Sequence, residues 1–211
     1  MPDHRNTRTH TAGHAPGPGH NLAPAPVSLW HQHMWARARA DHPVSRLPLP
    51  VVKMRMARAA ELGMRYSDYA ALYRTGGRDP AALLFTPAAL HLRLARRLDM
   101  PDPVRRHLAR LRACDLLALA PQSEDPDAFL EELREVSALP FRTAGIMPAP
   151  QASWQVLVAS LRRALDPLRL SGTAVALVAD DLSEARISQA LCTAGRLAGV
   201  VDRDAYFGVT V

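Results

Sequence analysis

The sequence predicts an α/β protein in which a basic helical N-terminal unit precedes a small, mostly parallel, three-layer α/β sheet. In the second half of the chain, continuous apolar runs alternate with amphipathic helical segments, which is typical of a parallel sheet covered on both faces. Residues 1–112 hold 18 of the 26 basic and 7 of the 20 acidic residues, whereas residues 113–211 hold 8 and 13. This division of charge favours two units with different partners.

The composition indicates a globular protein from a reducing compartment. Its 211 residues are 48% hydrophobic and only 5% aromatic, so the core must consist mainly of Leu, Val and Ala. Cys114 and Cys192 are far apart in segments with helical patterns, which is not a disulfide framework. Since the N-terminus has no apolar signal region and no run of about 18 apolar residues occurs, we expect a cytoplasmic protein with no membrane span.

Three parts are expected along the chain. Residues 1–28, rich in Pro, Gly, His and Thr, have almost nothing to bury and predict a disordered tail. A basic helical unit follows at 29–78, beginning with a short helix at 29–40. Residues 79–211 are expected to form the small α/β domain.

The basic unit is expected to contain two further helices. Apolar positions from Pro50 to Leu62 predict a helix that Gly63 ends. Ser67 is a suitable N-cap for a second helix over 68–74, which a pair of glycines stops.

The α/β domain is expected to alternate strands with helices. Apolar runs predict strands at 81–85, 116–120, 174–179 and 200–211. Helical patterns predict helices at 86–98, 103–114, 125–136, 154–165 and 183–199. The Pro-rich stretch 140–150 is expected to be a loop.

Residues 55–74 resemble a helix-turn-helix of the DNA-binding type. Ala59 is small where the two helices approach, Gly63 makes the turn, and Leu72 takes a packing position of the second helix. In such a unit the second helix enters the major groove. The expected DNA-contacting residues are Arg55, Arg58, Arg65, Tyr66, Ser67 and Arg74.

A purely structural helical hairpin satisfies the same pattern. Tyr66, Tyr69 and Tyr73 form a stripe of the kind that packs inward, and Asp68 would meet phosphate repulsion. Moreover, 25 of the 26 basic residues are Arg, which together with frequent Ala and Pro indicates the coding bias of a GC-rich bacterial genome. The uneven placement of the arginines is therefore better evidence for an anionic partner than their number.

The same stretch is similar to a family of uncharacterised alphaproteobacterial proteins. Over residues 62–90 the sequence LGMRYSDYAALYRTGGRDPAALLFTPAAL shows LG-x-x-Y-x-x-Y before a Gly-Arg-Asp turn and an apolar strand. The resemblance implies no activity, but it supports a strand that starts within 80–86.

Polar residues follow the apolar run 174–179 directly. Asp180, Asp181 and Ser183 would lie beyond the carboxyl end of a parallel strand, where ligands bind in open α/β sheets. Ordinary helix capping accounts for the same residues. No glycine-rich phosphate loop, Gly-Lys-Ser/Thr motif or nucleophile accompanies them, so we expect no catalytic residue and no cofactor.

Histidines concentrate at the N-terminus, where seven of the nine lie in residues 1–42. His31 and His33 have a spacing that can chelate a transition metal. A structural zinc site requires four closely spaced ligands, usually including Cys, and these are missing here. We therefore expect no functional metal site.

The leading interpretation is a non-catalytic regulatory or nucleic-acid-binding protein whose basic helical unit contacts DNA or a protein partner. The alternative is a small enzyme or ligand-binding domain that uses Asp180 and Asp181. The third is a protein–protein adaptor. Missing catalytic motifs weigh against an enzyme, and the division of charge favours binding.

Overall fold

The computed structural model describes residues 47–92 and 98–208. The tail expected at 1–28, the helix expected at 29–40, and His31 and His33 lie outside the described residues. Residues 48–211 cluster as one compact unit. Within the described ranges, no helix has both the length and the apolar character needed to cross a bilayer.

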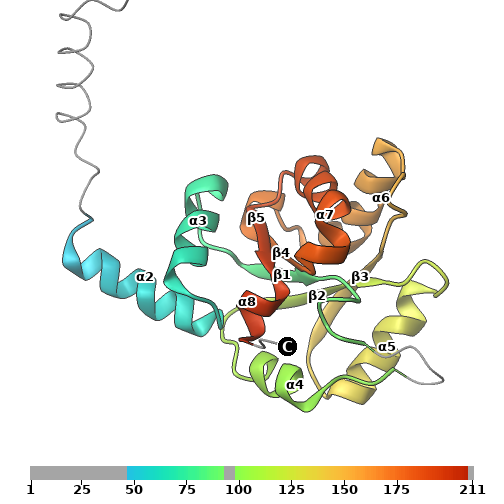
Figure 1. Ribbon diagram of the computed structural model, residues 1–211, viewed down its shortest axis with the longest axis horizontal. Coiled ribbons are helices and arrows are strands. Elements are labelled where there is room, and N and C mark those ends of the chain that lie inside the picture. Colours follow the sequence, from blue (N-terminus) through green and yellow to red (C-terminus); the bar gives the residue numbers. More distant parts are fainter. Residues whose placement is uncertain (1–46, 93–97, 209–211) are drawn as a thin grey trace, which may run out of the picture. The chain divides into compact units, whose positions relative to one another are not determined.

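The unit is a mixed α/β fold, as the sequence predicts (Figure 1). Its strands are β1 (Ala82–Phe85), β2 (Asp115–Ala120), β3 (Phe141–Ile146), β4 (Val175–Ala179) and β5 (Gly199–Asp202). Its α-helices are α2 (Leu49–Glu61), α3 (Tyr66–Gly76), α4 (Asp102–Leu108), α5 (Pro126–Ser137), α6 (Trp154–Leu165), α7 (Asp181–Gly195) and α8 (Arg203–Phe207).

The five strands form one parallel sheet in the order β3-β2-β1-β4-β5. The chain moves outward from β1 to β3 and then crosses to β4 on the other side of β1. The order therefore reverses between β1 and β4, and at such a switch point the loops at the carboxyl ends of the strands diverge and leave room for a ligand.

Two buried cores cover the two faces of the sheet, which confirms the three layers. Alternate residues of a strand point to opposite faces, so Leu83 and Phe85 of β1 join one core and Ala82 and Leu84 the other. Side chains of α2, α3, α4, α5 and α8 complete the first core, and those of α6 and α7 the second (Figure 1).

The helices α2 and α3 are packed onto the first of these cores. Ala59 of α2 and Tyr69 and Leu72 of α3 are buried there, and α3 lies against β5. The boundary expected between residues 78 and 79 falls between α3 and β1, inside the compact unit.

The expectation of a loop at 140–150 is wrong, because β3 occupies Phe141–Ile146. Its sequence, FRTAGI, mixes Arg, Thr and Gly with apolar residues, as an edge strand does, and so lacks the continuous apolar run of a central strand. A Cβ at Gly145 would lie 2.7 Å from the Ser160 carbonyl oxygen, so glycine lets α6 pack closely onto the strand.

Several predicted boundaries are also wrong. α4 ends at Leu108 rather than near Cys114, and the described part of 86–98 forms turns. α7 begins at Asp181, with Asp180 rather than Ser183 as its N-cap, and ends at Gly195. β5 stops at Asp202, because its side chain caps α8 by accepting from the Ala205 N–H.

Candidate functional site

The hairpin of α2 and α3 is the first candidate surface. Gly63 between the two helices has a φ of +65°, in the left-handed region that favours glycine. A Cβ there would lie 2.5 Å from His107 Nε2, so the close approach of α4 also requires glycine. The expected helical hairpin is confirmed in this geometry.

A cleft of about 610 Å³ lies between the two helices and the turn that follows α3. Cleft volumes of about 300–1,000 Å³ are typical of small-ligand sites. The lining contains three arginines, two tyrosines and one carboxylate, and comprises Val51, Met54, Arg55, Arg58, Tyr69, Tyr73, Gly77, Arg78 and Asp79.

Arg58, at the base of this cleft, has a structural role. Its Nε donates to Asp79 Oδ2 at 2.7 Å and its Nη1 to Glu61 Oε2 at 2.9 Å. The remaining N–H groups donate to the backbone carbonyls of Pro80, Arg112 and Ala113. A guanidinium has five N–H donors, so all of them are used within the protein.

Arg55 and Tyr73 form the wall of the cleft above Arg58. The guanidinium carbon of Arg55 lies 4.1 Å from the centre of the Tyr73 ring, which is a cation–π contact. Tyr69 is buried beside them and its hydroxyl donates to Asp79 Oδ1 at 2.9 Å. Burial, together with this hydrogen bond, raises the pKa of Tyr69 to about 12, so its hydroxyl stays protonated at neutral pH.

The acidic side chains of the hairpin are engaged by arginine. Arg58 holds Glu61 and Asp79, and Arg65 holds Asp68 through two hydrogen bonds of 2.8 and 3.1 Å. Little negative charge is therefore left to repel an anionic partner.

Three cationic side chains of the hairpin and of the turn that follows it are exposed to solvent. Lys53 lies on α2, Arg74 on α3, and Arg78 after α3 at the rim of the cleft. In the described part of the chain, no carboxylate forms an ion pair with any of the three. The hairpin therefore carries an uncompensated positive charge.

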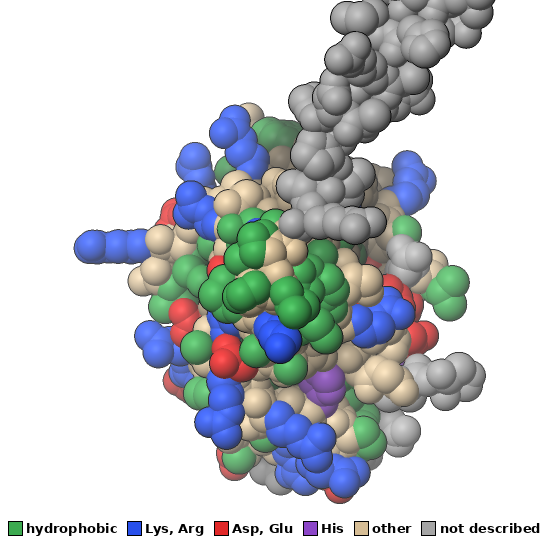
Figure 2. All heavy atoms as spheres, turned by 90° about the vertical axis from the view of Figure 1, so that its left-hand side faces the viewer, with side chains coloured by type: hydrophobic (Ala, Val, Ile, Leu, Met, Phe, Trp, Pro, Cys, Tyr) green, Lys and Arg blue, Asp and Glu red, His purple; other side chains and the backbone are tan. Residues whose placement is uncertain are grey.

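Apolar side chains of α2 are exposed as well. Figure 2 shows hydrophobic side chains gathered on the side of the molecule where α2 lies, with Lys and Arg side chains around them. Leu49, Met54 and Met56 of α2 are 66%, 65% and 53% exposed. Contiguous apolar surface of this kind marks interaction sites in soluble proteins.

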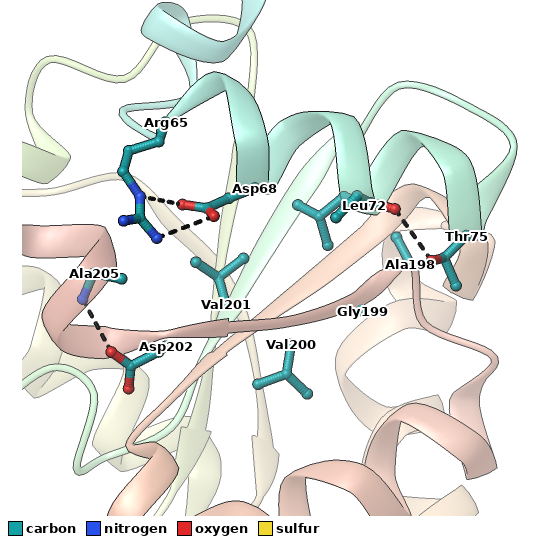
Figure 3. A pocket seen from close by; sticks show the side chains of 11 residues that line it. Arg65, Asp68, Leu72, Thr75, Ala198, Gly199, Val200, Val201, Asp202 and Ala205 are labelled. Atoms are coloured by element: carbon teal, nitrogen blue, oxygen red, sulfur yellow. Dashed lines mark hydrogen bonds and ion pairs between the residues drawn. The ribbon is translucent and has the colours of Figure 1, made fainter. Parts of the chain in front are cut away.

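The other DNA-contact candidates, Arg65, Tyr66 and Ser67, lie at the N-terminal end of α3. Tyr66 packs partly buried against the core, and the Ser67 hydroxyl donates to Asp68. Arg65 and Asp68 stand at one end of a groove of about 300 Å³ between α3 and β5 (Figure 3). Two carboxylates, of Asp68 and Asp202, line that groove beside a single arginine, so it suits phosphate less well than the cleft does.

The second candidate surface lies at the switch point between β1 and β4. Thr86 follows β1 and is fully buried, and its hydroxyl donates to Glu184 Oε2 of α7 at 2.5 Å. The same carboxylate oxygen accepts from the Asp180 N–H at 3.2 Å. This contact ties the end of β1 to the start of α7.

Asp180 is the centre of a small polar network at this edge. Its carboxylate accepts from the Leu182 N–H at 3.2 Å and from the Ser183 hydroxyl at 2.7 Å. Its Oδ2 also lies 3.4 Å from Nη1 of Arg203, which is an ion pair. The hydrogen bond from Ser183 is the main cause that lowers the pKa of Asp180. Asp180 thus has the capping role that the sequence allows, Ser183 supports it by donating to the capping carboxylate, and the side chain of the neighbouring Asp181 is not described.

Two further titratable groups lie near this network. Burial raises the pKa of Glu184, and burial together with the charge of Arg203 lowers the pKa of His91. His91 has a φ of +51°, and its Nε2 is buried without a hydrogen-bond partner among the described residues. Perturbed groups and unusual backbone angles are frequent at functional sites.

Sequence reasoning found Asp180 and Ser183 but missed Thr86, Glu184 and Arg203. Thr86 could have been found, because it is the first polar residue after an apolar strand. Nothing in the sequence connects Glu184 or Arg203 with it, since both reach the switch point from other elements.

Metal ligands are not brought together in what the structure describes. No group of three His, Cys, Asp or Glu side chains there could hold a metal ion. No protein family model, curated protein or solved structure matches the chain at a significant level. The class that the fold defines is a parallel α/β protein of five strands with a basic helical hairpin packed on one face.

Proposed function

We propose that this protein is a non-catalytic nucleic-acid-binding protein, regulatory in character, that contacts the phosphate backbone with the α2–α3 face. The observation that carries the proposal is a cleft lined by Arg55, Arg58 and Arg78, in whose lining Asp79, the one carboxylate, is held by Arg58. Arginine recognises phosphate through paired hydrogen bonds and tolerates partial burial.

The residues that we propose to contact phosphate differ from those that the helix-turn-helix pattern suggests. Lys53, Arg55, Arg74 and Arg78 are the residues that support phosphate binding, because their charges face solvent or the cleft. Arg58 supports it only indirectly, by neutralising Asp79 and fixing the shape of the cleft.

We expect labelled nucleic acid to bind at low salt, with an affinity that falls steeply as salt is added, because phosphate binding releases counterions. Arg74→Ala and Arg78→Ala should each weaken binding and reduce the slope of log K against log salt by about 1. Arg186→Ala is the matched control, since Arg186 is exposed on α7, which covers the opposite face of the sheet. Fluorescence anisotropy measures the affinity of the wild type and of the three variants for the labelled probe. A lack of binding to single- and double-stranded probes at low salt would refute the proposal.

A protein partner is a second candidate, and the exposed Leu49, Met54 and Met56 favour it. An apolar centre with a cationic rim is the usual anatomy of a protein interface. In that case the nucleic-acid assays would show no binding, and the partner would present apolar and acidic side chains.

The switch point supports the alternative of a small-ligand site at Asp180 and Asp181. Because Asn caps nearly as well as Asp, and Arg203 keeps Asp204 as a partner, we expect Asp180→Asn with Asp181→Asn to cost little stability beyond the lost ion pair between Asp180 and Arg203. Thermal unfolding with and without Mg²⁺ tests this. Stabilisation of the wild type by Mg²⁺ that the double variant loses would favour the ligand site, because hard cations require carboxylate oxygen.

A further inference from the structure

The cleft contains a planar cation that lies on an aromatic ring. One side of the Arg55 guanidinium lies on the Tyr73 ring, at 4.1 Å, and Arg55 also lines the cleft. Because Arg55 is only partly buried, the side of its guanidinium turned away from Tyr73 could offer a flat surface to a ligand that enters the cleft. Guanidinium planes and aromatic rings are the groups on which proteins stack unpaired bases.

Resting on the proposed function, we propose that the cleft takes one unstacked base of a single-stranded nucleic acid, which stacks on Arg55 to form a Tyr73–Arg55–base sandwich. The protein accordingly prefers single strands to duplex. Bases of a duplex are already stacked and paired, so they cannot enter a cleft without being extruded.

The remaining walls of the cleft fit a base and its phosphate. Val51 and Met54 supply apolar surface from α2, and the flexible Met54 side chain adapts to different ring shapes. Phosphates do not gain from apolar contacts, whereas base rings do, so the exposed Met54 side chain in the cleft favours single strands over a duplex surface.

The polar groups of the cleft place the phosphate at its rim. Arg78 is exposed there and lines the cleft, and it is free to contact a phosphate next to the inserted base. Asp79 offers little repulsion because Arg58 and the Tyr69 hydroxyl each donate to it. Since none of these groups is arranged to read a base edge, the cleft accepts any base.

The test compares a 12-nucleotide oligothymidylate that carries one central 2-aminopurine with a duplex of the same length. We expect the single strand to bind about tenfold more tightly, which corresponds to one stacked base. We also expect the 2-aminopurine emission to change on binding, because the base exchanges its neighbouring bases for the Arg55 guanidinium.

Two variants separate stacking from charge. Arg55→Lys keeps the positive charge but loses the planar guanidinium, so it should weaken single-strand binding much more than duplex binding and remove most of the preference for single strands. Tyr73→Leu keeps apolar bulk but removes the ring that supports Arg55, so it should also reduce the preference for single strands. Circular dichroism confirms that each variant is folded before it is compared.

The outcomes distinguish this inference from the proposed function. Equal affinity for both probes, without a change in emission and without an effect of Arg55→Lys, would overturn the inference but leave backbone binding intact. If neither probe binds at low salt, both the stacked base and the proposed nucleic-acid binding are refuted. A preference for single strands that Arg55→Lys abolishes would support the stacked base.

Discussion

Replacing Arg58 by Leu is expected to lower the free energy of unfolding by about 2–3 kcal/mol. The side chain is only 17% exposed, and the substitution removes all five of its hydrogen bonds at once. Its two carboxylate partners are themselves partly exposed, so solvent screens the ion pairs and they contribute little. Most of the loss comes instead from the three backbone carbonyls that lose their donor.

Urea unfolding followed by circular dichroism measures this loss. Arg74→Leu is the matched control, because Arg74 is exposed and forms no ion pair among the described residues; its effect should stay within about 0.5 kcal/mol. Arg58→Lys should recover little of the stability, since an ammonium has three donors and cannot reproduce the planar fork. Equal stability of Arg58→Leu and wild type would show that Arg58 does not hold α2 to the segments around residues 80 and 112.

Replacing Thr86 by Val is the second large effect, expected to cost about 2–3 kcal/mol at neutral pH. Valine has nearly the same shape as threonine, so packing at this fully buried position is kept and only the hydroxyl is lost. Among the described residues, Glu184 then keeps a single hydrogen bond, from the Asp180 N–H, in a partly buried position. The Ala89 N–H also loses the Thr86 oxygen that accepts from it.

The cost of Thr86→Val should depend on pH. Burial raises the pKa of Glu184 in the folded protein, so protonated Glu184 contributes stability that is present below its unfolded pKa and lost as pH rises through the folded value. The hydrogen bond from Thr86 opposes this shift, and its removal raises the pKa further. The difference in stability between wild type and Thr86→Val should therefore grow as pH rises from about 4, near the pKa of an unperturbed Glu, to neutrality.

Glu184→Gln provides the control for this pH dependence. With the titrating group removed, Thr86→Val should cost the same at acidic and neutral pH. Urea unfolding of the four proteins at several pH values gives the complete comparison. A cost of Thr86→Val that does not change with pH in the presence of Glu184 would show that the carboxylate is not held as described.

The sequence alone was sufficient for the fold class and for the elements with strong local patterns. The strands β1, β2 and β4 are continuous apolar runs, because both of their faces are buried, and α6 was predicted with its observed bounds. β3 was missed because an edge strand has one less neighbour and tolerates Arg142 and Gly145 among its apolar residues. The bounds of α7 were predicted wrongly at both ends. The helix starts earlier because Asp180 caps it, and it stops earlier because Arg196 adopts a left-handed conformation.

Only the tertiary structure decided the roles of individual charged residues. In the sequence, Arg55, Arg58 and Arg74 are equivalent candidates for contacting DNA. In the fold, Arg58 meets two carboxylates and three carbonyls from distant segments, Arg55 meets the Tyr73 ring, and Arg74 meets solvent. Similarly, Thr86 and Glu184 are 98 residues apart and come together only because the order of the strands places β1 beside β4. Hydrophobic periodicity is local and survives in the sequence, whereas the partner of a charge depends on which distant segments the packed core brings within hydrogen-bond distance.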